Sequence, residues 1–196
     1  MIEDTSTKEK VFKRDSDLIL RTAAPGDAEM ISQYFIRNRQ YLKPWEPARE
    51  DLFFSVEGWS QRLIKLHELH KMGLGYYCLL INAETNEMLG TVSFSNLSRF
   101  PFHACNVGYS LAESAQGHGY MRRGLTLAKD YMFDVQNVHR LMAGYMPRNK
   151  RSENVLHHLG FEREGYAKDY LQINGKWEDH ILTALVNPNW QDTRIG

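Results

Sequence analysis

The chain has 196 residues and carries 24 Lys and Arg against 24 Asp and Glu, so its formal net charge is zero. That length favours one domain with a sizeable core, and 42% hydrophobic with 12% aromatic residues excludes an intrinsically disordered chain. A balanced charge disfavours a dedicated nucleic-acid-binding protein, which usually carries a basic surplus. We therefore expect a folded globular protein without a direct nucleic-acid site.

The two cysteines, Cys78 and Cys105, lie 27 residues apart, and neither belongs to a CxxC pair. This spacing argues against a disulfide framework and a structural zinc site, and favours small buried side chains in a reducing compartment. The N-terminal segment is polar and lacks the apolar core of a signal peptide, and no apolar run approaches the roughly 18 residues that span a membrane. The sequence therefore predicts a soluble, cytoplasmic protein with no membrane contact.

The order of predicted elements indicates an α/β protein with a mixed sheet. Residues 1–15 are expected to form a polar tail or a leading edge strand, residues 16–186 the folded domain, and residues 187–196 a C-terminal tail. Apolar alternation, helical spacing and turn signals give the elements in chain order. These are a strand at 18–23, helices at 27–38 and 56–72, a hairpin of strands at 76–81 and 88–97, a strand at 103–112, a helix at about 120–135, a strand at 140–146, a helix at 150–160, and a final hairpin around Asn174-Gly175, a pair typical of a type I′ turn.

The phrase KPWEP, residues 43–47, separates the first two predicted helices. Two prolines within four residues exclude a helix or a central strand, so a loop is expected. A Trp held between prolines in a loop need not belong to the core, and loops on a rigid scaffold often carry binding residues. Trp45 and Glu46 are therefore candidate binding residues.

The most informative segment runs from residue 108 to 125. A strand ends near Leu111, and the phrase QGHG at 116–119 then opens a helix. Two glycines let the backbone approach a ligand closely, and the free amides of a helix N-terminus bind anions such as phosphate. Arg122 and Arg123 follow and are placed to reach further phosphate oxygens. The Walker pattern GxxxxGK[ST] and the dinucleotide pattern GxGxxG are both absent, which leaves a tight turn or another kind of phosphate-binding loop.

This loop carries a family resemblance. The phrase QGHGYM follows a predicted antiparallel strand, and NKRS at 149–152 and HHLGF at 157–161 come about thirty residues later; together they resemble the GNAT superfamily of N-acetyltransferases. The family's Q-x-x-G-x-[GA] pattern is matched except at its last position, where Met121 stands. The resemblance implies a single-domain GNAT fold of the α/β class, with a mixed and mostly antiparallel central sheet that is splayed at the acetyl-CoA site and has helices on both faces.

The resemblance also implies acetyl-CoA as the co-substrate, with no metal. The pyrophosphate would lie on the backbone amides of the glycine loop, and a backbone N–H of the splayed strand would hold the oxyanion. The residues implied to bind acetyl-CoA are Ser110, Leu111, Gln116, Gly117, His118, Gly119, Tyr120, Met121, Arg122, Asn149 and Ser152. Asn149 would contact the pantetheine arm or position its loop, and it is also a good N-cap for the helix that follows.

A closer resemblance covers residues 43–185. The phrases KPWEP, FHACNVGYS, YMPRNKRS, EGYAKDYL and NGKWEDHILTAL are similar to the RimJ type of ribosomal-protein-alanine N-acetyltransferases. This implies that the partner is the fifth protein of the small ribosomal subunit, whose N-terminal alanine is acetylated by direct attack of its α-amine on the thioester. An acetyltransferase for a small amine or antibiotic, and a non-catalytic module that binds acetyl-CoA, remain as alternatives.

The same resemblance suggests catalytic roles. Ser152 lies where related ribosomal-protein acetyltransferases place the general acid, and a cap or a water-binding role is equally open; the Tyr that other members carry seven positions after the Asn is Leu156 here. An α-amine with a pKa of ~7.7–8.0 is partly neutral at cytoplasmic pH, so a carboxylate acting through water suffices as the base. The Glu that relatives carry near position 106 is Asn106 here. Our hypothesis for the base is Glu46, which with Trp45 would form the acceptor site.

Two further sequence features bear on the site. The pairs His67-x-x-His70 and His157-His158 lack the HExxH spacing, so neither is expected to bind a metal. The balanced net charge conceals a division, because residues 116–151 hold seven Lys and Arg against two Asp, a net charge of +5, and the remainder carries −5. A positive field around the glycine loop would assist an anionic ligand.

Overall fold

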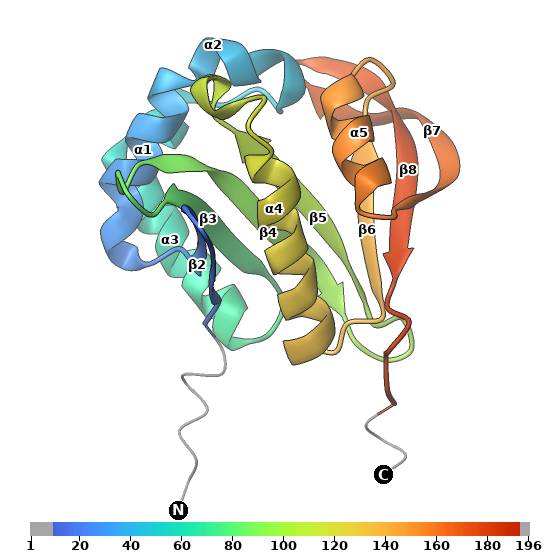
Figure 1. Ribbon diagram of the computed structural model, residues 1–196. Coiled ribbons are helices and arrows are strands. Elements are labelled where there is room, and N and C mark those ends of the chain that lie inside the picture. Colours follow the sequence, from blue (N-terminus) through green and yellow to red (C-terminus); the bar gives the residue numbers. More distant parts are fainter. Residues whose placement is uncertain (1–9, 193–196) are drawn as a thin grey trace, which may run out of the picture.

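The computed structural model describes residues 10–192, and one eight-stranded sheet runs through them (Figure 1). Its strand order is β1-β2-β3-β4-β5-β6-β8-β7, and every neighbouring pair is antiparallel except β5 and β6. The strands are β1 (Phe12–Asp15), β2 (Leu18–Thr22), β3 (Tyr76–Asn82), β4 (Met88–Ser98), β5 (Ala104–Leu111), β6 (Arg140–Tyr145), β7 (Glu162–Ile173) and β8 (Lys176–Val186). The predicted mixed and mostly antiparallel sheet is confirmed.

Helices cover both faces of the sheet. One face carries α1 (Ala28–Arg37) and α3 (Val56–Lys71), and α2 (Arg39–Leu42) continues from α1; the other face, toward the viewer in Figure 1, carries α4 (Tyr120–Asp130) and α5 (Lys150–His158). We call these the α1 face and the α5 face. No helix among residues 10–192 has the length and apolarity needed to cross a membrane.

An aromatic cluster fixes the helices on the α1 face. The ring of Phe35 in α1 stacks on that of Trp59 in α3 with centroids 5.4 Å apart, and Trp59 contacts Tyr77 of β3. Phe53 packs against both Phe35 and Trp59 and is itself buried. Because Phe53 belongs to the segment that follows the KPWEP phrase, this burial anchors that segment to the scaffold.

The structure adds detail to the expected elements in three segments. Within the first fifteen residues, Phe12–Asp15 form an edge strand, which was one of the two alternatives for that segment; residues 1–9 lie outside the described part. The KPWEP phrase contains a single 3₁₀ turn at Lys43–Trp45, so the expectation that it excludes a helix is wrong by one turn, since Pro44 occupies a first-turn position that needs no N–H. Beyond the last strand, Trp190 packs against His103 and His139.

The sheet opens between its two parallel strands. β5 pairs with β6 only where Ala104–Asn106 lie beside Arg140–Met142. Beyond that point β5 continues to Leu111 paired with β4 alone, and β6 continues to Tyr145 paired with β8 alone. The two strands therefore diverge over their second halves, which confirms the predicted splay and creates a gap at the centre of the molecule.

Candidate active site

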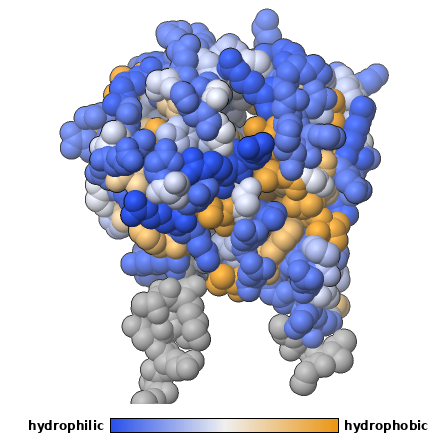
Figure 2. All heavy atoms as spheres, viewed as in Figure 1, coloured by the Kyte–Doolittle hydropathy of each residue, from blue (hydrophilic) through white to orange (hydrophobic). Residues whose placement is uncertain are grey.

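A cavity of about 890 Å³ occupies the place where β5 and β6 separate. Its walls come from both strands, from β8, from the N-terminal end of α5, and from the segment that contains Trp45 and Glu46. Figure 2 shows apolar side chains at the surface between α4 and α5, over β5 and β6, on a face that is otherwise mainly hydrophilic. A partly apolar hollow with a few polar groups is the usual form of a small-molecule site.

The alternation of side chains along β5 gives the cavity two sides. The hydroxyl of Tyr109 meets Ser152 of α5, whereas the hydroxyl of its neighbour Ser110 meets Tyr34 of α1. Successive strand residues point to opposite faces, so the gap between the strands connects the α5 face with the α1 face. Two reactants can therefore approach the gap from opposite sides of the sheet.

Two glycines face each other across this gap. The parallel register that pairs Asn106 with Met142, carried two residues further, brings Gly108 of β5 level with Gly144 of β6. Both glycines are exposed, and a Cβ added to Gly144 would meet only atoms at 3.6 Å or more. A side chain at either position would project toward the α1 face, so the pair keeps the passage open on that side.

The glycine loop lies at the other end of β5. Gly117 and Gly119 adopt φ values of +81° and +75°, and Gly119 precedes the first residue of α4. A Cβ at either glycine would meet nothing within 4 Å, so both open onto free space in front of the helix N-terminus. The unpaired amides of a first helical turn attract anions. The loop therefore has the form expected of a phosphate-binding loop.

The candidate acetyl-CoA-binding residues fall into two groups in the structure. Those that line the cavity are Ser110, Leu111, Gln116, Met121, Asn149 and Ser152, whereas Gly117, His118, Gly119, Tyr120 and Arg122 lie beside it on the loop and first turn. The side chain of Met121, the departure from the family pattern, is buried. The departure therefore leaves the backbone amide of this residue in place at the start of α4.

Contrary to the expectation from the sequence, Arg123 does not reach toward the glycine loop. Its guanidinium bonds the carboxylates of Asp15 and Asp17 at 2.7 and 2.8 Å, in the turn between β1 and β2. Tyr120 donates to Asp17 at 2.8 Å, and these two partners lower the pKa of the Asp17 carboxyl. The side chains of Tyr120 and Arg123 therefore tie the start of α4 to the edge of the sheet, and the phosphate-binding candidate that stays exposed is Arg122.

Asn149 and Ser152 begin α5. The side-chain oxygen of Asn149 accepts from the Ser152 amide at 3.1 Å, which is an N-cap bond. The cap is thus made by Asn149, and the hydroxyl of Ser152 is left for the cavity, where it lies 2.5 Å from the hydroxyl of Tyr109. Burial raises the pKa of Tyr109 to about 12, so this phenol stays protonated near neutral pH.

Tyr109 is a candidate that the sequence interpretation missed. Its only signal in the sequence is its place in the phrase NVGYS, one residue before Ser110 in a strand. Its relation to Ser152 depends on the packing of α5 over β5, which no local pattern reveals.

The acceptor candidates Trp45 and Glu46 line the cavity. The Arg148 guanidinium lies 4.9 Å from the centre of the Trp45 ring and donates to the Pro44 carbonyl at 3.0 Å. The Asn174 amide donates to the Glu46 carbonyl at 2.9 Å. The KPWEP phrase is therefore held from both sides, by the β6–α5 loop and by the β7–β8 turn.

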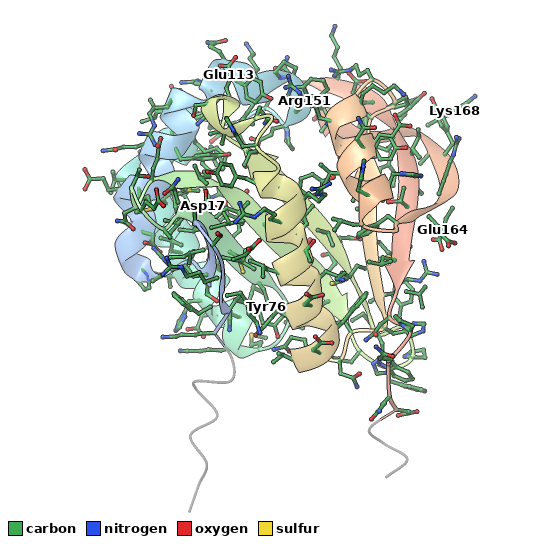
Figure 3. All side chains as sticks on the ribbon, in the orientation of Figure 1. Asp17, Tyr76, Glu113, Arg151, Glu164 and Lys168 are labelled. Carbon is green, nitrogen blue, oxygen red and sulfur yellow. The ribbon has the colours of Figure 1, made fainter. Side chains whose placement is uncertain are left out.

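The environment of Glu46 suits a group that receives a cation. Burial raises the pKa of the Glu46 carboxyl, and the nearby Arg49 opposes that shift. A partly desolvated carboxylate gains more from an incoming ammonium than an exposed one does, because water screens the exposed charge. Close by, Arg151 bonds the hydroxyl of Tyr41, and Figure 3 places its side chain between α5 and α2. This contact completes the bridge between the two walls of the cavity.

The cysteine and histidine pairs take no part in this arrangement. Cys78 and Cys105 are buried free thiols, and burial raises the pKa of each to about 12. Among residues 10–192 no three His, Cys, Asp or Glu side chains come together as a metal site. Of the two histidine pairs, His157 and His158 are exposed on α5 and His67 is exposed on α3.

Comparison with known proteins identifies the family. The family model of the acetyltransferase (GNAT) domain matches residues 17–162. Over 185 residues the chain is 46% identical to the ribosomal protein uS5-alanine N-acetyltransferase of Escherichia coli (strain K12), a match that covers 94% of this chain and 95% of that protein.

Solved structures agree. The ribosomal-protein-S5-alanine acetyltransferase from Vibrio fischeri has a TM-score of 0.91 at 50% identity and covers 93% of this chain and 100% of its own. Mycobacterium smegmatis RimJ, solved in complex with CoA-disulfide, has a TM-score of 0.84 at 26% identity and covers 93% of this chain and 89% of its own. The splayed sheet, the glycine loop and these matches lead to one conclusion: the chain is an acetyltransferase that belongs to the GNAT family.

Proposed function

We propose that the chain is an acetyl-CoA-dependent Nα-acetyltransferase that acts on the N-terminal alanine of ribosomal protein uS5, in the cytoplasm. The observation that carries this proposal is the two-sided cavity, with Tyr109 and Ser152 on the α5 face and Trp45 and Glu46 on the other wall. The named activity of the Escherichia coli relative, 46% identical over nearly the whole chain, supports the choice of substrate.

The donor would bind on the α5 face. The loop around Gly117 and Gly119 offers backbone amides to the pyrophosphate, and Arg122 adds a charge-assisted contact. The pantetheine arm would then pass Asn149 and bring the thioester to the gap between β5 and β6. The CoA-disulfide complex of the Mycobacterium smegmatis relative supports a coenzyme A site in this fold.

The reaction would take place in the gap, where acetyl-CoA from the α5 face meets the peptide from the α1 face. The neutral α-amine attacks the thioester carbonyl, a C–N bond forms and the C–S bond breaks. A backbone N–H of β5 near Ser110 or Leu111 would stabilise the oxyanion. Ser152 would protonate the leaving thiolate, and Tyr109, which shares a short hydrogen bond with it, would replace that proton. The proton that the amine nitrogen loses as the amide forms would restore the phenol of Tyr109. The high pKa of both cysteines argues against an acyl-enzyme, because neither thiol is ionised near neutral pH.

The test of the activity uses the wild-type protein, acetyl-CoA and a set of dodecapeptides. One peptide has the N-terminal sequence of uS5 beginning with Ala, a second carries an acetyl block on that Ala, and a third begins with Gln. We expect mass spectrometry to find one added acetyl group on the first peptide only, located on its α-amine. Acetylation of spermidine or an aminoglycoside in place of the peptide would support the small-amine alternative, and no acetyl transfer to any acceptor would support the non-catalytic one.

Substitution of Glu46 tests whether the cavity wall that contains Trp45 and Glu46 binds the peptide. An interaction with a charged group contributes about 1.5–3 kcal/mol, so Glu46→Gln is expected to raise KM for the Ala peptide about tenfold or more. KM for acetyl-CoA should not change, because the donor binds on the other face. The matched control is Glu50→Gln, a change on the exposed end of the same segment that does not line the cavity. An unchanged peptide KM in Glu46→Gln would contradict the assignment of this wall to the acceptor.

A further inference from the structure

His180 is a buried titratable side chain whose role no part of the donor or acceptor assignment explains. It lies on β8, keeps 4% of its surface exposed, and lines the cavity. Buried polar side chains are normally satisfied by hydrogen bonds. In His180 only one ring nitrogen is satisfied within residues 10–192: Nδ1 lies 3.0 Å from the backbone carbonyl of Glu178.

That single bond determines which ring nitrogen is free. A carbonyl oxygen only accepts, so Nδ1 must carry the proton and donate it. The neutral ring then has its lone pair on Nε2. Nε2 is not among the fully enclosed polar atoms without a partner in the described part of the chain, and His180 is one of the residues that line the cavity.

The register of the sheet places His180 on the acceptor side. Tyr145 of β6 donates to Glu153 of α5, so its side chain lies on the α5 face, and Ile181 is its partner on β8. His180 is the next residue along β8 and therefore points to the α1 face. Burial and the nearby Glu46 carboxylate raise the pKa of Tyr34 in α1, so Glu46 lies on the same side.

The same register places His180 level with Ser110, near the end of β5 that we assign to the oxyanion. The pairing of Asn106 with Met142, carried four residues further, brings Ser110 level with Met146. The pairing of Tyr145 with Ile181, carried one residue further, brings Met146 level with His180. Gly144 is the β6 residue that lies between His180 and the gap, and a Cβ there would be 3.7 Å from the Cδ2 atom of the ring, so no side chain separates the ring from the gap at this position.

A neutral imidazole suits proton transfer from an ammonium better than a carboxylate does. A carboxylate such as Glu46 stabilises the charged form of a neighbouring amine and so opposes its deprotonation. A neutral imidazole lacks that effect and offers a ring nitrogen that can accept the proton. The other groups near His180 are the Tyr170 ring, 5.5 Å away on β7, and the carboxylate of Asp179, which is already bonded by Tyr166 and by the Asp169 amide.

We propose that His180 is the proton acceptor for the peptide's α-ammonium, with Glu46 as the group that attracts it; this inference rests on the proposed function. Nε2 takes one proton from the ammonium, and the neutral amine attacks the thioester. The second proton leaves the nitrogen as the intermediate collapses and balances the proton that the thiolate takes up. His180 returns its proton to solvent, so one proton is released per acetyl group transferred.

Chemical rescue tests this role. His180→Ala leaves a space in the cavity wall, and its kcat with the Ala peptide is expected to fall about 10²-fold, the usual contribution of a general base. KM for acetyl-CoA should stay the same. Added imidazole should restore part of kcat, increasingly as the pH rises and more of the imidazole is neutral. His180→Gln, which fills the space, should be as slow and should not respond to imidazole.

The controls separate the possible outcomes. His157→Ala, on the exposed side of α5, should keep the wild-type kcat with or without imidazole. A His180→Ala variant with wild-type kcat would overturn the proposal, and so would a slow variant that folds and binds acetyl-CoA but does not respond to imidazole. A loss of kcat in Glu46→Gln with none in His180→Gln would make Glu46 the base. The wild-type rate tests the proposed function, whereas the ratio of variant to wild type tests His180, so the two failures are distinguishable.

Discussion

Ser152→Ala is expected to lower kcat about 10²-fold while KM for acetyl-CoA stays near the wild-type value, because a positioned general acid contributes roughly that factor. The helix should survive the change, since the N-cap bond joins the backbone amide of residue 152 to Asn149 and does not use the serine hydroxyl. A pure loss of kcat therefore reports on proton transfer to the thiolate. Steady-state kinetics with the Ala peptide measure it directly.

Tyr109→Phe extends this prediction to the partner hydroxyl. It should lower kcat about tenfold, and the double variant should be no slower than Ser152→Ala alone, because groups that act as one unit are not additive. The high pKa of Tyr109, about 12, means that its loss should not change the pH profile below about pH 10. Ser60→Ala, an exposed serine that bonds its own helix, is the control. Fully additive losses would contradict a shared proton path.

Gly119→Val is expected to raise KM for acetyl-CoA about 10- to 100-fold, because a β-branched residue is a genuine outlier at φ +75° and must distort the loop. The added side chain would also occupy the free space in front of the first amides of α4. Isothermal titration with coenzyme A measures the same loss without the reaction.

The matched control for this change is Gly73→Val. Gly73 has a similar φ of +66°, follows α3, and lies outside the cavity wall. Both variants should lose thermal stability to a similar extent, and only Gly119→Val should lose affinity for acetyl-CoA. Equal affinities in the two variants would contradict the assignment of the loop to the pyrophosphate.

The parts of the fold that could be predicted from sequence are those encoded locally. The hairpin turn at Asn174-Gly175 adopts φ values of +46° and +80°, as a type I′ turn requires. The helix after the glycine loop begins at Tyr120, directly after Gly119. Both features depend on a few neighbouring residues, so the sequence pattern was sufficient.

The contacts that could not be predicted depend on which segments meet in space. Arg123 looked like a phosphate ligand from its place in the helix, yet two carboxylates from the β1–β2 turn bind it. Tyr109 and His180 gain their interest from strand register, which sets the face that each side chain points to. Local patterns in one sequence do not show which distant segments pair with each other.

The ion pairs of the basic segment have a consequence for how an anion would be captured. Of the seven Lys and Arg in residues 116–151, Arg123, Lys129, Arg140, Arg148 and Lys150 are each paired with a carboxylate. Among residues 10–192, only Arg122 and Arg151 of these seven have no acidic partner. Neighbouring carboxylates therefore neutralise most of the +5 charge, and long-range attraction of a nucleotide depends on two cations and the helix dipole. Two cations and a helix dipole act over a short range in salt solution, so they contribute to binding once the ligand is in place and add little to its rate of association.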